Sequence, residues 1–240
     1  MIDFFASLNW AAVLQIIVID ILLGGDNAVV IALACRNLPS SQRLQGVLWG
    51  TAGAIILRVI LIVFAVALLN IPFLKMAGGL LLLWIGVKLL LPEHDAHGKI
   101  EPADRLVAAI KTIIVADLVM SLDNVIAIAG AAEGAAEEHR VFLIVFGLVV
   151  SIPLIVWGSQ LVLKLLDKFP IIITLGAALL GWIAGGLIVT DPGVKHWPVL
   201  AGENVHYIGS VLGAIGVVLV GLFMKSRMQR RQASEKTSAE

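Results

Sequence analysis

Two apolar stretches of the chain carry acidic and amide side chains at the same spacing. Residues 16–34 read IIVIDILLGGDNAVVIALA, and residues 113–131 read IIVADLVMSLDNVIAIAGA. A shift of 97 positions aligns three polar residues of the first stretch with three of the second: Asp20 with Asp117, Asp26 with Asp123, and Asn27 with Asn124. A helix needs about 20 apolar residues to cross the hydrocarbon core of a bilayer. The pattern therefore predicts an internal repeat that places carboxylates and amides at membrane depth.

Carboxylates at this depth are costly, which makes a functional role the default interpretation. An ionised aspartate at the centre of a membrane helix costs about 2.5–3.5 kcal/mol. Only one cation, Arg58, is expected at a comparable depth, so most of the aspartates must be protonated, hydrated or bound to a cation. Carboxylate, amide and main-chain oxygens are hard ligands that suit Mg²⁺, Ca²⁺ and Mn²⁺. No histidine or cysteine is expected deep in a span, which disfavours zinc and copper.

Helical geometry predicts how the motif residues are oriented. Asp20 and Asn27 are two turns apart and nearly share a face, and the second copy repeats this relation. Asp26 would point about a third of a turn away on an unbroken helix. Local unwinding is expected at Gly24-Gly25 in the first copy and at Ser121 in the second. An unwound turn would free main-chain carbonyls as further ligands.

Two other residues near the motifs have a functional and a structural interpretation each. Arg58 is either a counter-ion that is released when a metal binds or a partner in a permanent ion pair. Met120, inside the second copy, is a candidate additional ligand that would bias a site toward Mn²⁺. Methionine in a membrane core is more often a packing residue, and this interpretation is favoured for Met120.

The composition is typical of a polytopic membrane protein. Of the 240 residues 60% are hydrophobic and 14% are charged, and the mean hydropathy is +1.01. The net charge is zero, which gives no reason to expect nucleic acid as a partner. The single cysteine, Cys35, excludes an intrachain disulfide and a cysteine-rich zinc site. The first residues lack Lys and Arg, so we expect the first span to be retained rather than cleaved as a signal peptide.

The hydropathy pattern predicts seven transmembrane helices in an all-α membrane fold. The expected spans are 11–34, 46–69, 73–91, 107–131, 141–163, 170–189 and 206–224. With the N-terminus outside, 13 of the 17 Lys and Arg residues lie on the inner side and 3 on the outer side. The positive-inside rule therefore predicts a multi-pass protein of the plasma (inner) membrane with a cytoplasmic C-terminus.

The repeat extends beyond the two motifs. Residues 77–86 (AGGLLLLWIG) resemble residues 175–184 (LGAALLGWIA), and each segment contains a tryptophan at the matching place. We therefore expect two three-helix repeats, 11–91 and 107–189, followed by an extra helix at 206–224. An odd number of spans per repeat inverts the second copy, as in many secondary transporters. Glycines at positions 46, 50 and 53 should let the second helix approach its neighbours closely.

Residues 1–224 are thus expected to form a single transmembrane domain, with 225–240 as a disordered cytoplasmic tail. The inner loop 92–105 contains four potential metal ligands: Glu93, His94, Asp95 and His97. A solvated loop is the favoured interpretation, because nothing in the sequence fixes the geometry of these ligands.

The Asp-Asn motifs resemble those of a known family. LLGGDNAVVIAL in the first span and SLDNVIAIA in the fourth are similar to the TerC family of integral membrane proteins, and the resemblance extends over all seven spans. It implies a seven-helix inverted-repeat fold like that of the LysE-type exporters, and export of divalent cations, chiefly Mn²⁺. It also implies a transport site formed by Asp20, Asp26, Asn27, Asp117, Asp123 and Asn124.

Three functions are compatible with the motifs. The first is a secondary transporter with a midplane site at the repeat interface, without a prosthetic group and without the nucleotide-binding motif of an ATP-driven pump. The second is an intramembrane aspartyl protease, since Gly24-Gly25-Asp26 resembles a G-x-G-D motif, but the duplicated site argues against an enzyme. The third is a membrane scaffold in which the aspartates only join helices. The ion, the coupling and homo-oligomerisation are left open.

Overall fold

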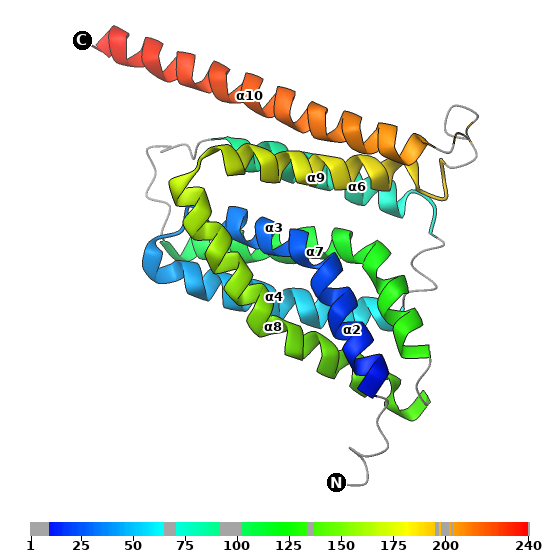
Figure 1. The fold of residues 1–240 in the computed structure, drawn as a ribbon. Helices are drawn as coiled ribbons and strands as arrows, with labels where there is room; N and C mark the ends of the chain where they lie inside the picture. The colour runs from blue at the N-terminus through cyan, green and yellow to red at the C-terminus, as the bar shows by residue number, and fades with distance from the viewer. Residues whose placement is uncertain are drawn as a thin grey trace. The chain divides into compact units, whose positions relative to one another are not determined.

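A computed structural model describes residues 10–64, 71–91, 102–133, 137–194, 197, 202 and 204–239 (Figure 1). Over these residues the regular structure consists of eight helices and no strand, as expected for an all-α fold. The chain divides into two compact units, each formed by separate parts of the sequence. Unit 1 comprises Met1–Asn70 and Glu101–Lys164, and unit 2 comprises Ile71–Ile100 and Leu165–Glu240.

Unit 1 contains the two motif-bearing segments and the helices that pack on them. Its helices are α2 (Trp10–Leu23), α3 (Gly25–Cys35), α4 (Ser40–Val63), α7 (Pro102–Glu133) and most of α8 (Glu137–Lys168). Apolar side chains from α2, α4, α7 and α8 form one core, which includes Ile16, Ile55, Ile128 and Leu143. Because all four helices contribute to this core, the polar motif residues are held within a packed bundle.

Close contact between α4 and α7 depends on two glycines, as the sequence predicted. A Cβ atom at Gly50 would lie 2.5 Å from Cδ1 of Ile113, and one at Gly53 would lie 2.5 Å from Cδ1 of Ile114. Real Cβ atoms do not approach other atoms so closely. At Gly50 the added atom would also lie 3.1 Å from Cβ of Ile113, so a larger residue there would push α4 away from the helix that carries the second motif, whereas at Gly53 the end of the Ile114 side chain would have to move.

The first motif lies on a broken helix. α2 ends at Leu23, α3 begins at Gly25, and the two helices are bent by 51° relative to one another (Figure 1). A Cβ atom at Gly24 would overlap the main-chain oxygen of Asp20, so this bend requires glycine. The unwinding expected at Gly24-Gly25 is therefore confirmed.

The second motif lies on an unbroken helix. α7 is helical from Pro102 to Glu133, so the unwinding expected at Ser121 is not found. The physical reason is the local sequence: Ser121 and Leu122 occupy the places that Gly24 and Gly25 occupy in the first copy. Both residues are compatible with a continuous helix, whereas glycine favours a break.

Unit 2 consists of α6 (Leu74–Leu90), α9 (Ile171–Val189) and α10 (Val205–Ala239). A Cβ atom at Gly181 would overlap the main-chain oxygen of Gly213, and one at Gly185 would overlap that of Gly209. These small residues, spaced four apart on both helices, bring the backbones of α9 and α10 into direct contact. α10 continues beyond residue 224, so the segment expected to be a tail forms its last turns.

Asp191, which follows α9, fixes the start of α6. Its carboxylate is fully buried and accepts hydrogen bonds from the backbone N–H groups of Phe73 (2.8 Å), Met76 (3.0 Å) and Gly193 (2.6 Å). The first N–H groups of a helix have no partner within the helix, and a carboxylate is a favourable acceptor for them. Asp191 therefore acts as an N-terminal cap supplied by a distant part of the chain.

Four described helices are long and apolar enough to cross a membrane, and the bent α2–α3 pair makes up to five. The four are Ser40–Ile62, Phe142–Lys168, Ile171–Val189 and Val205–Arg230. Helices also occupy the predicted spans 73–91 and 107–131, but α6 has only 17 residues and α7 is not among the candidates. A multi-pass membrane protein is thus supported, while the count of seven spans and the inverted repeat stay predictions.

Candidate functional site

The equivalent aspartates of the two motifs meet inside unit 1. Arg58 of α4 donates through Nη1 to Oδ1 of Asp20 on α2, and through Nη2 to Oδ1 of Asp117 on α7. All three residues are buried, with exposed fractions of 2% for Arg58, 1% for Asp20 and 6% for Asp117. One guanidinium therefore joins positions that are 97 residues apart in the sequence.

Ser121 completes the contacts of the guanidinium. Arg58 Nε donates to the hydroxyl oxygen of Ser121 at 3.0 Å, and this hydroxyl donates to Oδ2 of Asp117 at 3.1 Å. Ser121 lies one helical turn after Asp117, so both side chains are on the same face of α7. Sequence reasoning considered Ser121 only as a helix breaker. The signal it missed was the four-residue spacing between a serine and a buried carboxylate.

The position of Arg58 follows from the pattern of α4. Gly50, Ala54 and Arg58 recur every fourth residue, and all three are buried. This spacing puts them on one face of the helix. The glycine that lets α4 approach α7 therefore lies on the same face as the arginine that binds the α7 aspartate.

The charges of this cluster do not balance. Two carboxylates face one guanidinium, so the cluster carries an excess negative charge when both are ionised. Several kcal/mol are needed to bury each ion, and only close pairing with good hydrogen bonds offsets the cost. Loss of the guanidinium would leave two carboxylates facing one another without compensation.

Several buried polar atoms near the break have no hydrogen-bond partner in the part of the chain that the structure describes. They are Oδ2 of Asp20 and the amide oxygen and nitrogen of Asn27. The buried hydroxyl of Thr51, on α4, also has no hydrogen-bond partner among the described residues. A buried polar group without a partner costs about 1–3 kcal/mol. Buried groups of this kind usually bind water or an ion, so the oxygens of Asp20 and Asn27 are available to a polar ligand.

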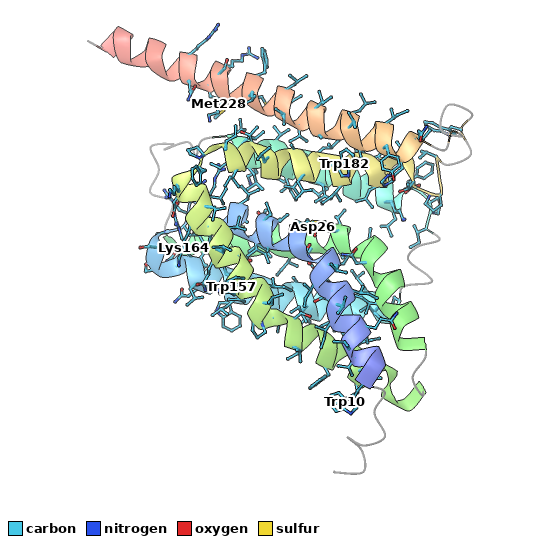
Figure 2. All side chains as sticks on the ribbon, viewed as in Figure 1. Trp10, Asp26, Trp157, Lys164, Trp182 and Met228 are labelled. Atoms are coloured by element: carbon cyan, nitrogen blue, oxygen red, sulfur yellow. The ribbon has the colours of Figure 1, made fainter. Side chains whose placement is uncertain are left out.

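The other predicted site residues lie on α3 and α7. Asp26, at the start of α3 (Figure 2), is half-buried and accepts a hydrogen bond from the backbone N–H of Asn27 at 2.9 Å. Asn124 is half-buried and Met120 is buried, both on α7. The side chain of Asp123 lies outside the described residues, as does the loop segment with Glu93, His94, Asp95 and His97.

No three His, Cys, Asp or Glu side chains come together as a metal site among the described residues. A cation bound here would therefore have to combine Asp20 and Asp117 with neutral oxygens, such as the amide of Asn27 or the hydroxyl of Ser121. Oxygen-only ligand sets with few charges suit hard divalent cations. The donor set present thus fits the class of ion that the sequence predicted.

The described part of the chain is all-helical, and several of its helices are long and apolar enough to cross a membrane, which indicates an integral membrane protein. The sequence relatives agree. The family model described as "Integral membrane protein TerC family" matches residues 5–232. The chain belongs to the TerC family, as its Asp-Asn motifs indicated.

The curated relatives are also membrane proteins. The chain is 49% identical over 212 residues to the "Uncharacterized membrane protein YjbE" of Bacillus subtilis, covering 88% of this chain and 94% of the relative. It is 26% identical to the B. subtilis membrane protein YceF, with 73% and 70% covered. It is 22% identical to the "UPF0053 inner membrane protein YgdQ" of Escherichia coli, with 67% and 73% covered. No solved structure matches.

Proposed function

We propose that this protein is a secondary transporter that exports divalent metal cations from the cytoplasm, with Mn²⁺ as the leading substrate. The observation that carries the proposal is the convergence of Asp20 and Asp117 on one buried guanidinium. Equivalent residues of two sequence copies meet inside one helical unit. Transporters built from inverted repeats have their ion sites where residues of the two repeats come together.

Asp20 and Asp117 are the principal ligands in this proposal. Asn27 is the best-supported additional ligand, since its buried amide has no hydrogen-bond partner within the described chain. Asp26, Asp123 and Asn124 are assigned to the site by the repeat and the family motif. Met120 is assigned a packing role, with ligation of the metal as the alternative.

The choice of Mn²⁺ among the hard divalent cations rests on the family resemblance. Oxygen ligands accept Mg²⁺, Ca²⁺ and Mn²⁺ alike, and the geometry of the cluster does not rank them. In the proposal, seven spans in two inverted repeats, with an outer N-terminus and a cytoplasmic C-terminus, alternate the access of the site between the two sides of the plasma membrane.

The alternative functions receive less support. In an aspartyl protease two carboxyl groups share a proton directly, whereas a guanidinium binds both Asp20 and Asp117 here. A scaffold would need helix-joining contacts but no acceptor atoms without partners, and among the described residues Asp20 and Asn27 both have such atoms.

Transport is tested by measuring Mn²⁺ flux into proteoliposomes that contain the purified full chain. We expect Asp20→Asn and Asp117→Asn to reduce the flux at least tenfold, because the amide keeps a hydrogen-bonding oxygen but loses the charge. Asp104→Asn is the matched control, since Asp104 is exposed on α7. Competition by Ca²⁺, Mg²⁺ and Zn²⁺ ranks the substrates. A wild-type protein that moves no divalent cation would contradict the proposal, as would folded variants with normal flux.

A further inference from the structure

We propose that Arg58 is a tethered substitute cation: its guanidinium binds Asp20 and Asp117 when the site is free of metal, and the transported ion displaces it. This inference rests on the proposed function. It adds the step in which the metal-free site changes its access back to the side from which the next ion is taken up. It assigns to Arg58 a role in net transport that differs from metal binding and from simple helix pairing.

The geometry places Arg58 where the metal would bind. Its two terminal nitrogens each contact one aspartate, so the guanidinium occupies the space between the two carboxylates. A divalent cation shared by these carboxylates, with metal–oxygen bonds of about 2.0–2.6 Å, would need the same space. Because the guanidinium and the metal repel each other, the two cations bind Asp20 and Asp117 in alternation.

Charge compensation explains why a transporter would need such a cation. An empty site with two ionised carboxylates would have to change its access while buried and without a counter-charge, which is strongly unfavourable. With Arg58 in place, the guanidinium compensates one of the two negative charges and binds both carboxylates, which lowers the cost of reorienting the empty site. Without it, the site can reorient only with an ion bound, so the protein could exchange ions across the membrane but not carry out net transport.

Ser121 gives the guanidinium a second anchor. Its hydroxyl accepts a hydrogen bond from Arg58 Nε and donates one to Asp117 Oδ2. Ser121 therefore holds Arg58 beside Asp117, the carboxylate that the guanidinium releases when the metal binds. Oδ2 of Asp20, in contrast, is buried and has no hydrogen-bond partner within the described chain. The metal would therefore first bind on the Asp20 side and then replace the guanidinium at Oδ1 of both aspartates.

The test compares two modes of transport in proteoliposomes that contain the full chain. Net flux is measured with Mn²⁺ on one side only, and exchange is measured as radioactive Mn²⁺ uptake with unlabelled Mn²⁺ on the other side. For Arg58→Gln we expect the ratio of net flux to exchange to fall at least tenfold while exchange continues. Lys111→Gln is the control, because Lys111 is exposed on α7, and we expect it to keep both rates.

A permanent structural pair would give a different result. Net flux and exchange would then fall together in Arg58→Gln, or neither would change, and either outcome overturns the proposal. If the wild-type protein performs neither mode, the proposed function fails as a whole. If it transports in both modes and only the ratio is insensitive to Arg58, the transport function stands and this inference alone fails.

Equilibrium binding of Mn²⁺ keeps the proposal testable if Arg58→Gln does not fold. Arg58→Lys retains the charge but cannot bind two carboxylates through a planar fork. Because a weaker competitor then faces the metal, we expect Arg58→Lys to bind Mn²⁺ several-fold more tightly than the wild type. Unchanged or weaker binding by the folded variant would overturn the proposal.

Discussion

At the scale of single residues, the central feature is one buried guanidinium, that of Arg58, which binds the equivalent aspartates of both motifs. The cost of burying charge singled out the aspartates and Arg58 from the sequence alone, because charged side chains within membrane spans are rare and usually functional. That Arg58 binds Asp20 and Asp117 together could not be predicted, since the pairing depends on which faces of α2, α4 and α7 pack. The contact between Arg58 and Ser121 could not be predicted for the same reason.

Ser121→Ala is expected to weaken the site without unfolding the protein. The change removes an acceptor for Arg58 and a donor to Asp117, which corresponds to a loss of about 1–3 kcal/mol. Thermal unfolding in detergent measures the loss. Ser159→Ala is the matched control, because among the described residues the buried hydroxyl of Ser159 bonds only to the carbonyl of Ile155 in its own helix. Equal effects of the two changes would argue against a special role for Ser121.

Asp191 is expected to make the stability of unit 2 depend on pH. Burial raises the pKa of its carboxyl group, but the backbone N–H groups of Met76, Gly193 and Phe73 more than offset this and hold the pKa below its usual range. A lowered pKa in the folded protein means that the stabilisation is complete above the pKa of the unfolded chain, about 3.9. It is lost as the pH falls through the lower folded value.

Asp191→Ala should therefore reduce stability by about 1.5–3 kcal/mol at neutral pH and by progressively less in acid. Thermal unfolding of the detergent-solubilised protein between neutral and acidic pH measures this difference. Asp104→Ala, at an exposed position, serves as the control. If the stability difference between Asp191→Ala and the wild type stays constant down to strongly acidic pH, the ionised carboxylate is not the stabilising group.

At the scale of helices, hydropathy predicted where the elements lie, and glycine indicated where the first one breaks. The Gly24-Gly25 pair predicted the break between α2 and α3, since glycine is the residue that tolerates such a bend. The same reasoning failed for the second copy, where Ser121 is a much weaker helix breaker than two glycines. The two copies of the motif therefore differ in backbone structure despite their similar sequences.

Gly24→Ala and Gly25→Ala form a matched pair of neighbouring changes. A methyl group at Gly24 would overlap the main-chain oxygen of Asp20, whereas one at Gly25 would meet no atom of the described residues within 4 Å. We expect Gly24→Ala to cost about 1–3 kcal/mol and to reduce Mn²⁺ flux, because it displaces the helix that carries Asp20. Gly25→Ala should stay within about 0.5 kcal/mol of the wild type. Similar flux and stability for both variants would contradict the assigned bend.

The contact between α9 and α10 gives an independent prediction for unit 2. A methyl group at Gly213 would overlap the main-chain oxygen of Gly181, but one at Gly216 would meet nothing within 4 Å in the part of the chain that the structure describes. Gly213→Ala is expected to destabilise the protein by about 1–3 kcal/mol, and Gly216→Ala to leave it unchanged or slightly more stable. Thermal unfolding of the two variants measures the difference. Loss of stability in Gly216→Ala alone would show that the helices pack differently.

At the scale of the whole molecule, the two compact units do not coincide with the two predicted sequence repeats. Unit 1 contains the helices of the first two predicted spans of each repeat, and unit 2 contains the third of each together with α10. The similarity between the two halves of the sequence predicts the order of the spans along the chain, but it does not predict which helices pack together. For this reason the sequence predicted the repeat, whereas only the structure shows that both motifs belong to one unit.

The central claim is that Asp20, Asp117 and Arg58 share one cation-binding site. Electron paramagnetic resonance of Mn²⁺ added to the purified protein tests this claim most directly, because bound Mn²⁺ is distinguished from the free ion. We predict saturable binding in the wild type, at least tenfold weaker binding in Asp20→Asn and Asp117→Asn, and tighter binding in Arg58→Lys. Equal Mn²⁺ affinity in all four proteins would show that the buried cluster is only a structural ion pair.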